Sequence, residues 1–226
     1  MQNQEFRTGV IKPIECVKEG WELIKSDYWL LFAVTLVGVL IGAMTLYILL
    51  GGMVCGIYYV YLKRIDSGPV VFDDLWKGFS WWLPGLVVAA FIIVPMLFLY
   101  GILYFPLIMA AVMGNHLSES ELWSIIGGAF VVDLVFIVIM VCFHTLILFA
   151  FPLIVDRKMG AFKAMLTSSK AVWKNLGGIA GLYAVNFVLS LAGGFACGVG
   201  IYFVIPIIFA GNLVAYRRIF PADANI

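Results

Sequence analysis

Residues 176–216 have the sequence LGGIAGLYAVNFVLSLAGGFACGVGIYFVIPIIFAGNLVAY, and no charged side chain interrupts them. A membrane-spanning helix needs about 20 predominantly apolar residues, so this stretch is long enough for two such helices. A glycine cluster at 193–200 lies in its middle and favours a turn there. The stretch therefore predicts a helical hairpin that crosses a lipid bilayer twice.

Three further apolar stretches meet the same length requirement, namely residues 28–62, 82–114 and 123–155. The first, divided near residues 42–45, predicts two short spans of roughly 15 to 17 residues each, close to the lower limit. A re-entrant hairpin is the alternative for this stretch. Each of the other two predicts one span, and polar residues 115–121 join them. We therefore predict an all-α, polytopic transmembrane bundle of about six spans, forming one domain over residues 1–226.

The composition excludes an ordinary soluble domain. The chain is 64% hydrophobic and 12% charged, whereas soluble domains are about 25% charged. A soluble chain of 226 residues still exposes a large surface, which this composition cannot cover with polar groups. The net charge is only +1, so we expect the lipid bilayer as partner and no nucleic acid.

The basic residues predict the orientation in the membrane. All 14 Lys and Arg residues lie in four polar segments: 1–27, 63–81, 156–175 and 217–226. With six spans, these segments share one side of the membrane. Because positively charged loops remain in the cytoplasm, we expect both termini to be cytoplasmic.

Three of these segments predict amphipathic helices. Apolar residues recur at spacings of three and four within 14–28, 72–82 and 162–176, and charged residues occupy the other face. Such a helix lies in the headgroup plane with its charged face in water. We therefore expect three interfacial helices on the cytoplasmic face. In the second, the predicted water-facing residues are Asp73, Asp74 and Lys77. In the third, the predicted apolar face comprises Phe162, Leu166, Ser169, Trp173 and Leu176.

The order of these features suggests an internal repeat. Each unit has an interfacial helix, two spans and a basic exit, and the exits are residues 63–64, 157–158 and 217–218. The repeats predicted in this way cover residues 9–64, 68–158 and 160–218. Two spans per unit preserve the direction of the chain, unlike the inverted repeats of many secondary transporters.

Asp133 and His144 are the ionisable side chains within the third apolar stretch. An intramembrane carboxylate is costly and is a functional candidate by default. Because they lie eleven residues apart, close to three helical turns, both residues face the same side of a helix. They can line a polar seam for transport. The alternatives are that Asp133 lies at the outer interface and that His144 bonds a neighbouring carbonyl or hydroxyl group.

The densest positive cluster is a candidate site for anionic lipid headgroups. A basic residue near an anionic membrane surface contributes about 1 kcal/mol to binding, and ordinary topogenic charge is the alternative interpretation. The cluster comprises Arg157, Lys158, Lys163, Lys170 and Lys174. Two Gly-x-x-x-Gly pairs, Gly38–Gly42 and Gly52–Gly56, predict close helix packing.

The sequence gives no sign of catalytic chemistry. The 2 histidines and 4 cysteines are scattered without metal-ligand or redox spacing, and no phosphate-binding loop occurs. We therefore expect no catalytic residues, no metal and no cofactor, and thus a protein that is not an enzyme.

Two segments carry a resemblance to a known group of proteins. They are GWELIKSDYW at 20–29 and FPLIVDRKMGAFKAMLTSSKAVWKNLG at 151–177. Both resemble uncharacterised six-span bacterial membrane proteins similar to YciC, and the membrane domain attached to some glycerophosphodiester phosphodiesterases. The resemblance implies a multi-pass protein of the bacterial inner membrane. It transfers no site residues, because the phosphodiesterase activity belongs to a separate soluble barrel.

The expected function is a non-enzymatic component that organises lipids or serves as a scaffold for partner proteins. A small transporter or channel that uses Asp133 and His144 is the alternative. The sequence leaves open whether the chain forms a homo-oligomer or binds another membrane protein.

Overall fold

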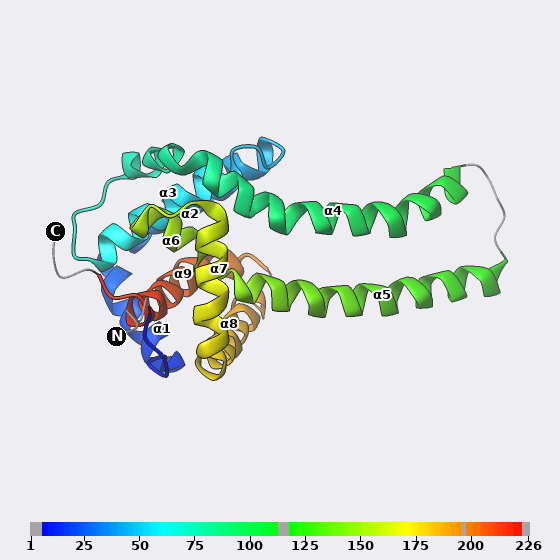
Figure 1. Ribbon diagram of the computed structural model, residues 1–226. Coiled ribbons are helices and arrows are strands. Elements are labelled where there is room, and N and C mark those ends of the chain that lie inside the picture. The colour runs from blue at the N-terminus through cyan, green and yellow to red at the C-terminus, as the bar shows by residue number, and fades with distance from the viewer. Residues whose placement is uncertain (1–5, 113–117, 196–197, 223–226) are drawn as a thin grey trace. The chain divides into compact units, whose positions relative to one another are not determined.

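The computed structural model describes residues 6–112, 118–195 and 198–222, which are mostly helical and contain no β-strand (Figure 1). The predicted all-α class is confirmed. Within these residues, five helical segments are long and apolar enough to cross a membrane, as expected of a membrane protein. The segments are Pro13–Met44, Phe72–Ile102, Ile126–Arg157, Leu176–Phe195 and Gly200–Ile219.

The α-helices in chain order are α1 (Pro13–Ile24), α2 (Tyr28–Met44), α3 (Leu50–Ile65), α4 (Trp82–Val112), α5 (Glu119–Leu146), α6 (Ala150–Arg157), α7 (Ala161–Lys174), α8 (Leu176–Phe195) and α9 (Gly200–Ile219). Two 3₁₀ helices, η1 (Lys25–Asp27) and η2 (Phe72–Trp81), precede α2 and α4. The predicted connection at 115–121 and the glycine cluster at 193–200 fall partly on residues 113–117 and 196–197, which lie outside the described residues.

The first apolar stretch forms the predicted pair of short helices. α2 has 17 residues and α3 has 16. Between them, Leu46 and Tyr47 have positive φ angles of 50° and 67°, a left-handed conformation that turns the chain. The 16 residues of α3 fall below the length that a full span usually needs, so α3 is not among the five long segments. That α3 crosses the bilayer stays a prediction.

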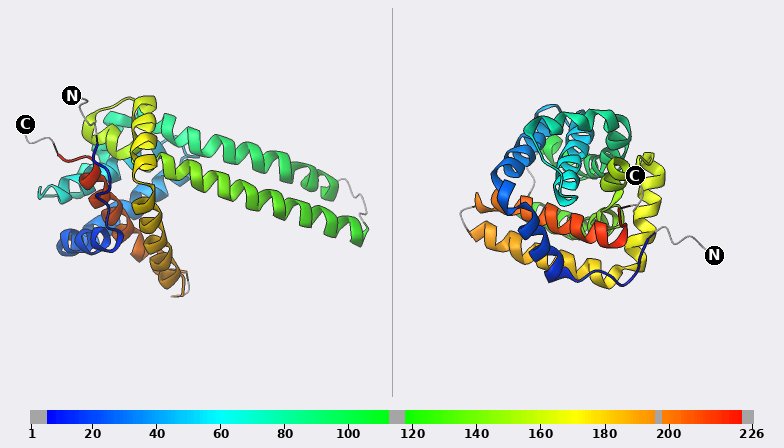
Figure 2. Two further views of the ribbon diagram at one scale, coloured as in Figure 1. Left: turned by 60° about the horizontal axis from the view of Figure 1, so that its bottom comes forward. Right: turned by 90° about the vertical axis from the view of Figure 1, so that its left-hand side faces the viewer.

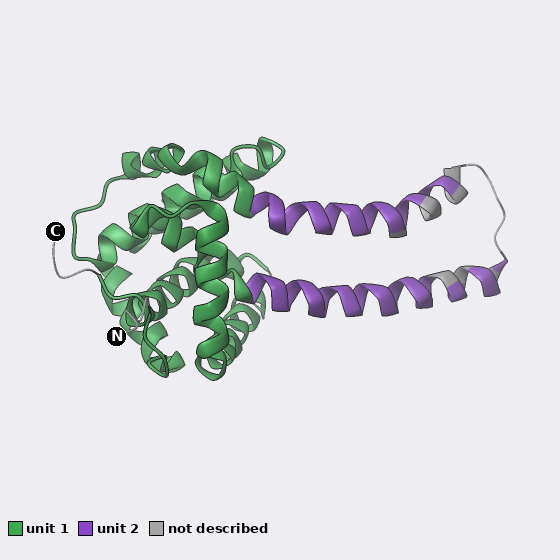
Figure 3. Cartoon of the chain, viewed as in Figure 1, with its two compact units in different colours: residues 1–88, 146–226 green, residues 89–145 purple. Residues whose placement is uncertain are grey.

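The chain divides into two compact units (Figure 3). Unit 1 comprises residues 1–88 and 146–226, and unit 2 comprises residues 89–145. Unit 2 is the hairpin of α4 and α5. Its helix α5 begins at a capping box, in which Ser118 Oγ accepts from the Glu121 N–H and the Glu121 carboxylate accepts from the Ser118 N–H and hydroxyl. These hydrogen bonds lower the pKa of Glu121.

In unit 1, each of three short helices packs against a helix that ends at a basic exit. α1 packs against α9, η2 against α3, and α7 against α6 (Figure 2). η2 and α7 thus each contact the final helix of the preceding predicted repeat. α1, which belongs to the first predicted repeat, contacts the final helix of the third. The three contacts form a closed cycle within unit 1.

Glycines allow the close contacts of α1 with α9 and of η2 with α3. A Cβ atom added to Gly20 of α1 would lie 2.7 Å from the backbone nitrogen of Gly211 in α9. A Cβ atom on Gly78 of η2 would collide with the backbone of Gly52 and Gly56 in α3. The predicted role of Gly52–Gly56 in close helix packing is confirmed.

The third contact of the cycle uses a hydrogen-bonded serine. Ser168 of α7 donates from its hydroxyl to the Leu146 carbonyl at 2.8 Å, and it accepts from the Phe149 N–H at 3.0 Å. Ser168 is fully buried, and the two backbone groups lie where α5 ends and α6 begins. The hydroxyl therefore satisfies backbone groups at a helix break, where the helix leaves them without partners.

The predicted water-facing surface of η2 is wrong at one residue, while Asp73 and Lys77 are exposed as expected. Asp74 of η2 was expected to face water, but only 2% of its surface is exposed. Its carboxylate accepts from Lys63 and from Lys77, each at 2.7 Å, and from the Val71 N–H. A buried carboxylate is tolerated when cations and hydrogen bonds compensate its lost hydration. Periodicity within η2 alone does not show that Lys63 lies beside it.

The Gly20 contact predicts that alanine substitution changes the free energy of unfolding differently at two glycines. Gly20→Ala should lower the free energy of unfolding by about 1–3 kcal/mol, because the new methyl group meets the α9 backbone. Gly128→Ala in α5 is the control, since no atom lies within 4 Å of its Cβ position. It should leave stability unchanged or raise it by up to about 1 kcal/mol through helix propensity. Unfolding titrations in detergent measure both, and equal effects would contradict the close contact.

Candidate functional site

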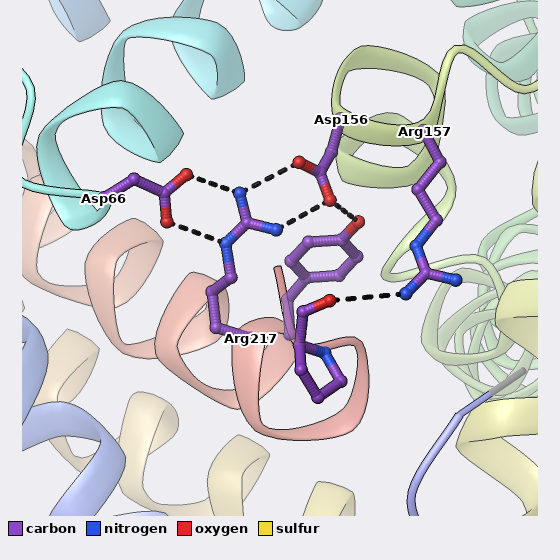
Figure 4. A network of polar contacts seen from close by, with 6 residues as sticks. Asp66, Asp156, Arg157 and Arg217 are labelled. Carbon is purple, nitrogen blue, oxygen red and sulfur yellow. Dashed lines mark hydrogen bonds and ion pairs between the residues drawn. The ribbon is translucent and has the colours of Figure 1, made fainter. Parts of the chain in front are cut away.

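Arg217, near the end of α9, binds two carboxylates at once (Figure 4). Its guanidinium donates to the two oxygens of Asp66 at 3.0 and 2.6 Å, and to those of Asp156 at 2.7 and 2.9 Å. The Tyr216 hydroxyl also donates to Asp156, at 2.6 Å. Bidentate pairs of this kind fix geometry as well as adding energy. The side chain of Arg217 is 14% exposed, so water screens these pairs only in part.

The three charged residues come from the ends of three helices. Asp66 follows the last residue of α3, Asp156 lies in the last turn of α6, and Arg217 lies in the last turn of α9. A shallow groove of about 320 Å³ lies beside them, and Lys63 also lines it. Because Lys63 and Arg217 are already paired with carboxylates, this cluster joins helices and offers no unpaired cation to an anionic ligand.

Other basic residues at the helix ends are paired as well. Arg64 of α3 pairs with Asp27 at 2.6 Å, and Arg218 of α9 pairs with Glu19 of α1 at 2.7 Å. From sequence these basic residues were expected only to set the orientation in the membrane, and their acidic partners were not predicted. The available signal was the position of Asp66 and Asp156, each within two residues of a basic exit.

The five predicted anionic-lipid residues separate into two groups. Arg157 is half-buried, with its guanidinium 5.2 Å from the centre of the Phe220 ring and a long hydrogen bond of 3.5 Å to the Pro221 carbonyl. Lys158 ends α6 in a left-handed conformation with φ of 51° and is exposed. The other three, Lys163, Lys170 and Lys174, are exposed along α7. The structure thus leaves four lysines accessible and packs the arginine against an aromatic ring.

The predicted apolar face of α7 points away from the protein. Phe162, Leu166 and Trp173 are 63%, 63% and 69% exposed, whereas small residues of the opposite face, such as Ala164 and Ala171, are fully buried. Three lysines and several large apolar side chains therefore share the outer surface of one helix. This combination is typical of helices that lie at a membrane surface.

Asp133 and His144 both lie on α5, but the structure pairs Asp133 with a different residue. The Tyr104 hydroxyl of α4 donates to Asp133 at 2.6 Å, which joins the two helices of unit 2. This bond satisfies one carboxylate oxygen inside the hairpin. His144 is exposed near the end of α5. That the two residues form a transport seam stays a prediction.

In the part of the chain that the structure describes, no group of three or more His, Cys, Asp or Glu side chains can hold a metal ion. Comparison with known proteins gives no match to a family model, to a curated protein or to a solved structure. The resemblance to the YciC-like proteins therefore stays a prediction.

The Arg217 cluster predicts a large difference between neighbouring arginines. Arg217→Gln should lower the free energy of unfolding by about 2–4 kcal/mol, because two partly buried carboxylates lose their shared cation. Arg218→Gln is the matched control. Its partners Glu15 and Glu19 are about half exposed, so its loss should cost less than about 1 kcal/mol. Unfolding titrations in detergent compare the two, and similar losses would show that Arg217 does not anchor the three helices.

Proposed function

We propose that this protein is a non-enzymatic membrane component that gathers anionic lipids at its basic face. The observation that carries the proposal is the outer surface of α7, where exposed lysines flank exposed Phe162, Leu166 and Trp173. A lipid bilayer with anionic headgroups complements both kinds of residue on this surface.

The magnitudes support a selective attraction. Each lysine close to an anionic membrane contributes about 1 kcal/mol, so Lys163, Lys170 and Lys174 together supply about 3 kcal/mol. Burying apolar side chains contributes about 25 cal/mol per Å² but does not distinguish one lipid from another. The lysines therefore set the preference for anionic lipids, and the apolar residues hold α7 at the interface. Salt should weaken the preference, because exposed charges are screened.

The same proposal includes the orientation and the location. The basic helix ends lie at the cytoplasmic side of a bacterial inner membrane, with both termini in the cytoplasm, in keeping with the positive-inside rule and with the resemblance of residues 151–177.

Reporter fusions test the orientation. A fluorescent protein fused to the C-terminus should fluoresce, and alkaline phosphatase at the same place should be inactive, because the first folds in the cytoplasm and the second matures in the periplasm. The opposite pair of results would place the basic face outside. Phosphatase inserted after Ser120 should be active, which gives a positive control on the other side.

Lipid composition tests the function. We expect the protein from nanodiscs of equal phosphatidylglycerol and phosphatidylcholine to retain more phosphatidylglycerol, as measured by native mass spectrometry. The combined change of Lys163, Lys170 and Lys174 to Gln should reduce this enrichment, as should 1 M salt. Retained lipid that mirrors the bulk mixture in the unchanged protein would refute the proposal.

A further inference from the structure

A groove of about 420 Å³ lies beside α7 in unit 1. The surface that its lining exposes is apolar, and the alkyl portions of two lysines form part of it. The lining residues are Phe6, Leu146, Ser169, Lys170, Trp173 and Lys174. Four of them lie on α7, while Phe6 comes from the N-terminal segment and Leu146 from the end of α5. The groove therefore requires the folded chain, and no single helix supplies it.

The wall that carries Phe6 is fixed by hydrogen bonds. The amide of Asn175, which follows α7, donates to the Arg7 carbonyl at 3.1 Å and accepts from the Gly9 N–H at 2.8 Å. The Arg7 N–H donates to the Ile219 carbonyl of α9 at 2.8 Å. The Phe6 ring also packs edge-on against Phe220, with ring centres 6.1 Å apart. These contacts hold Phe6 in place at the groove.

Two lysines whose alkyl portions line the groove carry their positive charge beside it. Lys170 and Lys174 lie four residues apart, so they project from the same side of α7. No acidic residue occurs in α7, and neither lysine is ion-paired with a carboxylate among the described residues. Lys63, Arg64 and Arg217, in contrast, all have carboxylate partners. The two lysines therefore remain available to a ligand.

We infer that the groove binds one anionic phospholipid, with its phosphate between Lys170 and Lys174. One acyl chain lies along Phe6, Leu146 and Trp173. This inference rests on the proposed function and adds a discrete site and its stoichiometry.

The lining favours a phospholipid over other anions. A free phosphate would pair with the lysines but would leave the apolar wall of Phe6, Leu146 and Trp173 in water, at a cost of about 25 cal/mol per Å². A phospholipid covers that wall with its acyl chain. Tryptophan is also enriched at the membrane–water interface, where its ring is buried and its N–H remains hydrated. The exposed Phe162 and Leu166 of the same helix place the groove at the edge of the bilayer.

Charge-matched variants test the site. Lys170→Gln and Lys174→Gln should each weaken binding of the tightest phosphatidylglycerol about fivefold, the equivalent of about 1 kcal/mol per lysine. Lys18→Gln in α1 is the control, because it removes one exposed lysine that does not line the groove, and it should change this binding less than twofold. Native mass spectrometry from nanodiscs of graded phosphatidylglycerol content measures occupancy, and unfolding titrations confirm that each variant folds.

The outcomes separate this site from the general function. One tightly held phosphatidylglycerol that depends on Lys170 and Lys174 supports the site. Equal effects of all three lysine changes would overturn it while leaving a diffuse anionic-lipid preference intact. Absence of any phosphatidylglycerol enrichment would overturn both. Millimolar glycerol phosphate, which has the headgroup chemistry without acyl chains, should leave the lipid bound, and displacement would exclude the acyl-chain contact.

Discussion

One guanidinium connects the ends of three helices in unit 1. Arg217 of α9 holds Asp66 after α3 and Asp156 of α6 in two bidentate pairs. In lipid, apolar helices gain little from contact with one another, because the lipid tails are equally apolar. Specific polar and close-packed contacts must then select the arrangement. Arg217 serves this purpose where the helices leave their apolar stretches, and the closely packed glycines serve it along their length.

The buried side of α7 carries small residues such as Ala164 and Ser168 beside the larger Val172, and α1 likewise places Gly20 against α9. Phe162, Leu166 and Trp173 of α7 are exposed on the outside. The structural role and the proposed lipid-binding role of α7 thus use different faces of one helix.

Much of this fold follows from sequence. The lengths of the apolar stretches predict the helices, and 17 and 16 residues for α2 and α3 agree with the expected short pair. Helix lengths can be predicted locally, because the thickness of the bilayer sets how many consecutive apolar residues a spanning helix needs. The partner of Asp74 was not predictable, since Lys63 reaches it only through tertiary packing. Asp66 and Asp156 lie next to basic exits in the sequence, but only the folded chain shows that both bind Arg217. The groove beside α7 was not predicted for the same reason, because the segment that carries Phe6 is held next to α7 by the hydrogen bonds of Asn175.

Because α1 packs against α9, its main partner is synthesised long after α1 itself. Glu19 of α1 pairs with Arg218 of α9 across 199 residues of chain. At about 5–20 residues per second, the ribosome needs about 10–40 s to supply the partner of α1 after α1 itself is made. During that time α1 lacks α9, the helix that its Gly20 contacts most closely. The contact of α1 with α9 thus forms late, and the surface of α1 that makes it must be sheltered by lipid or by the insertion machinery until then.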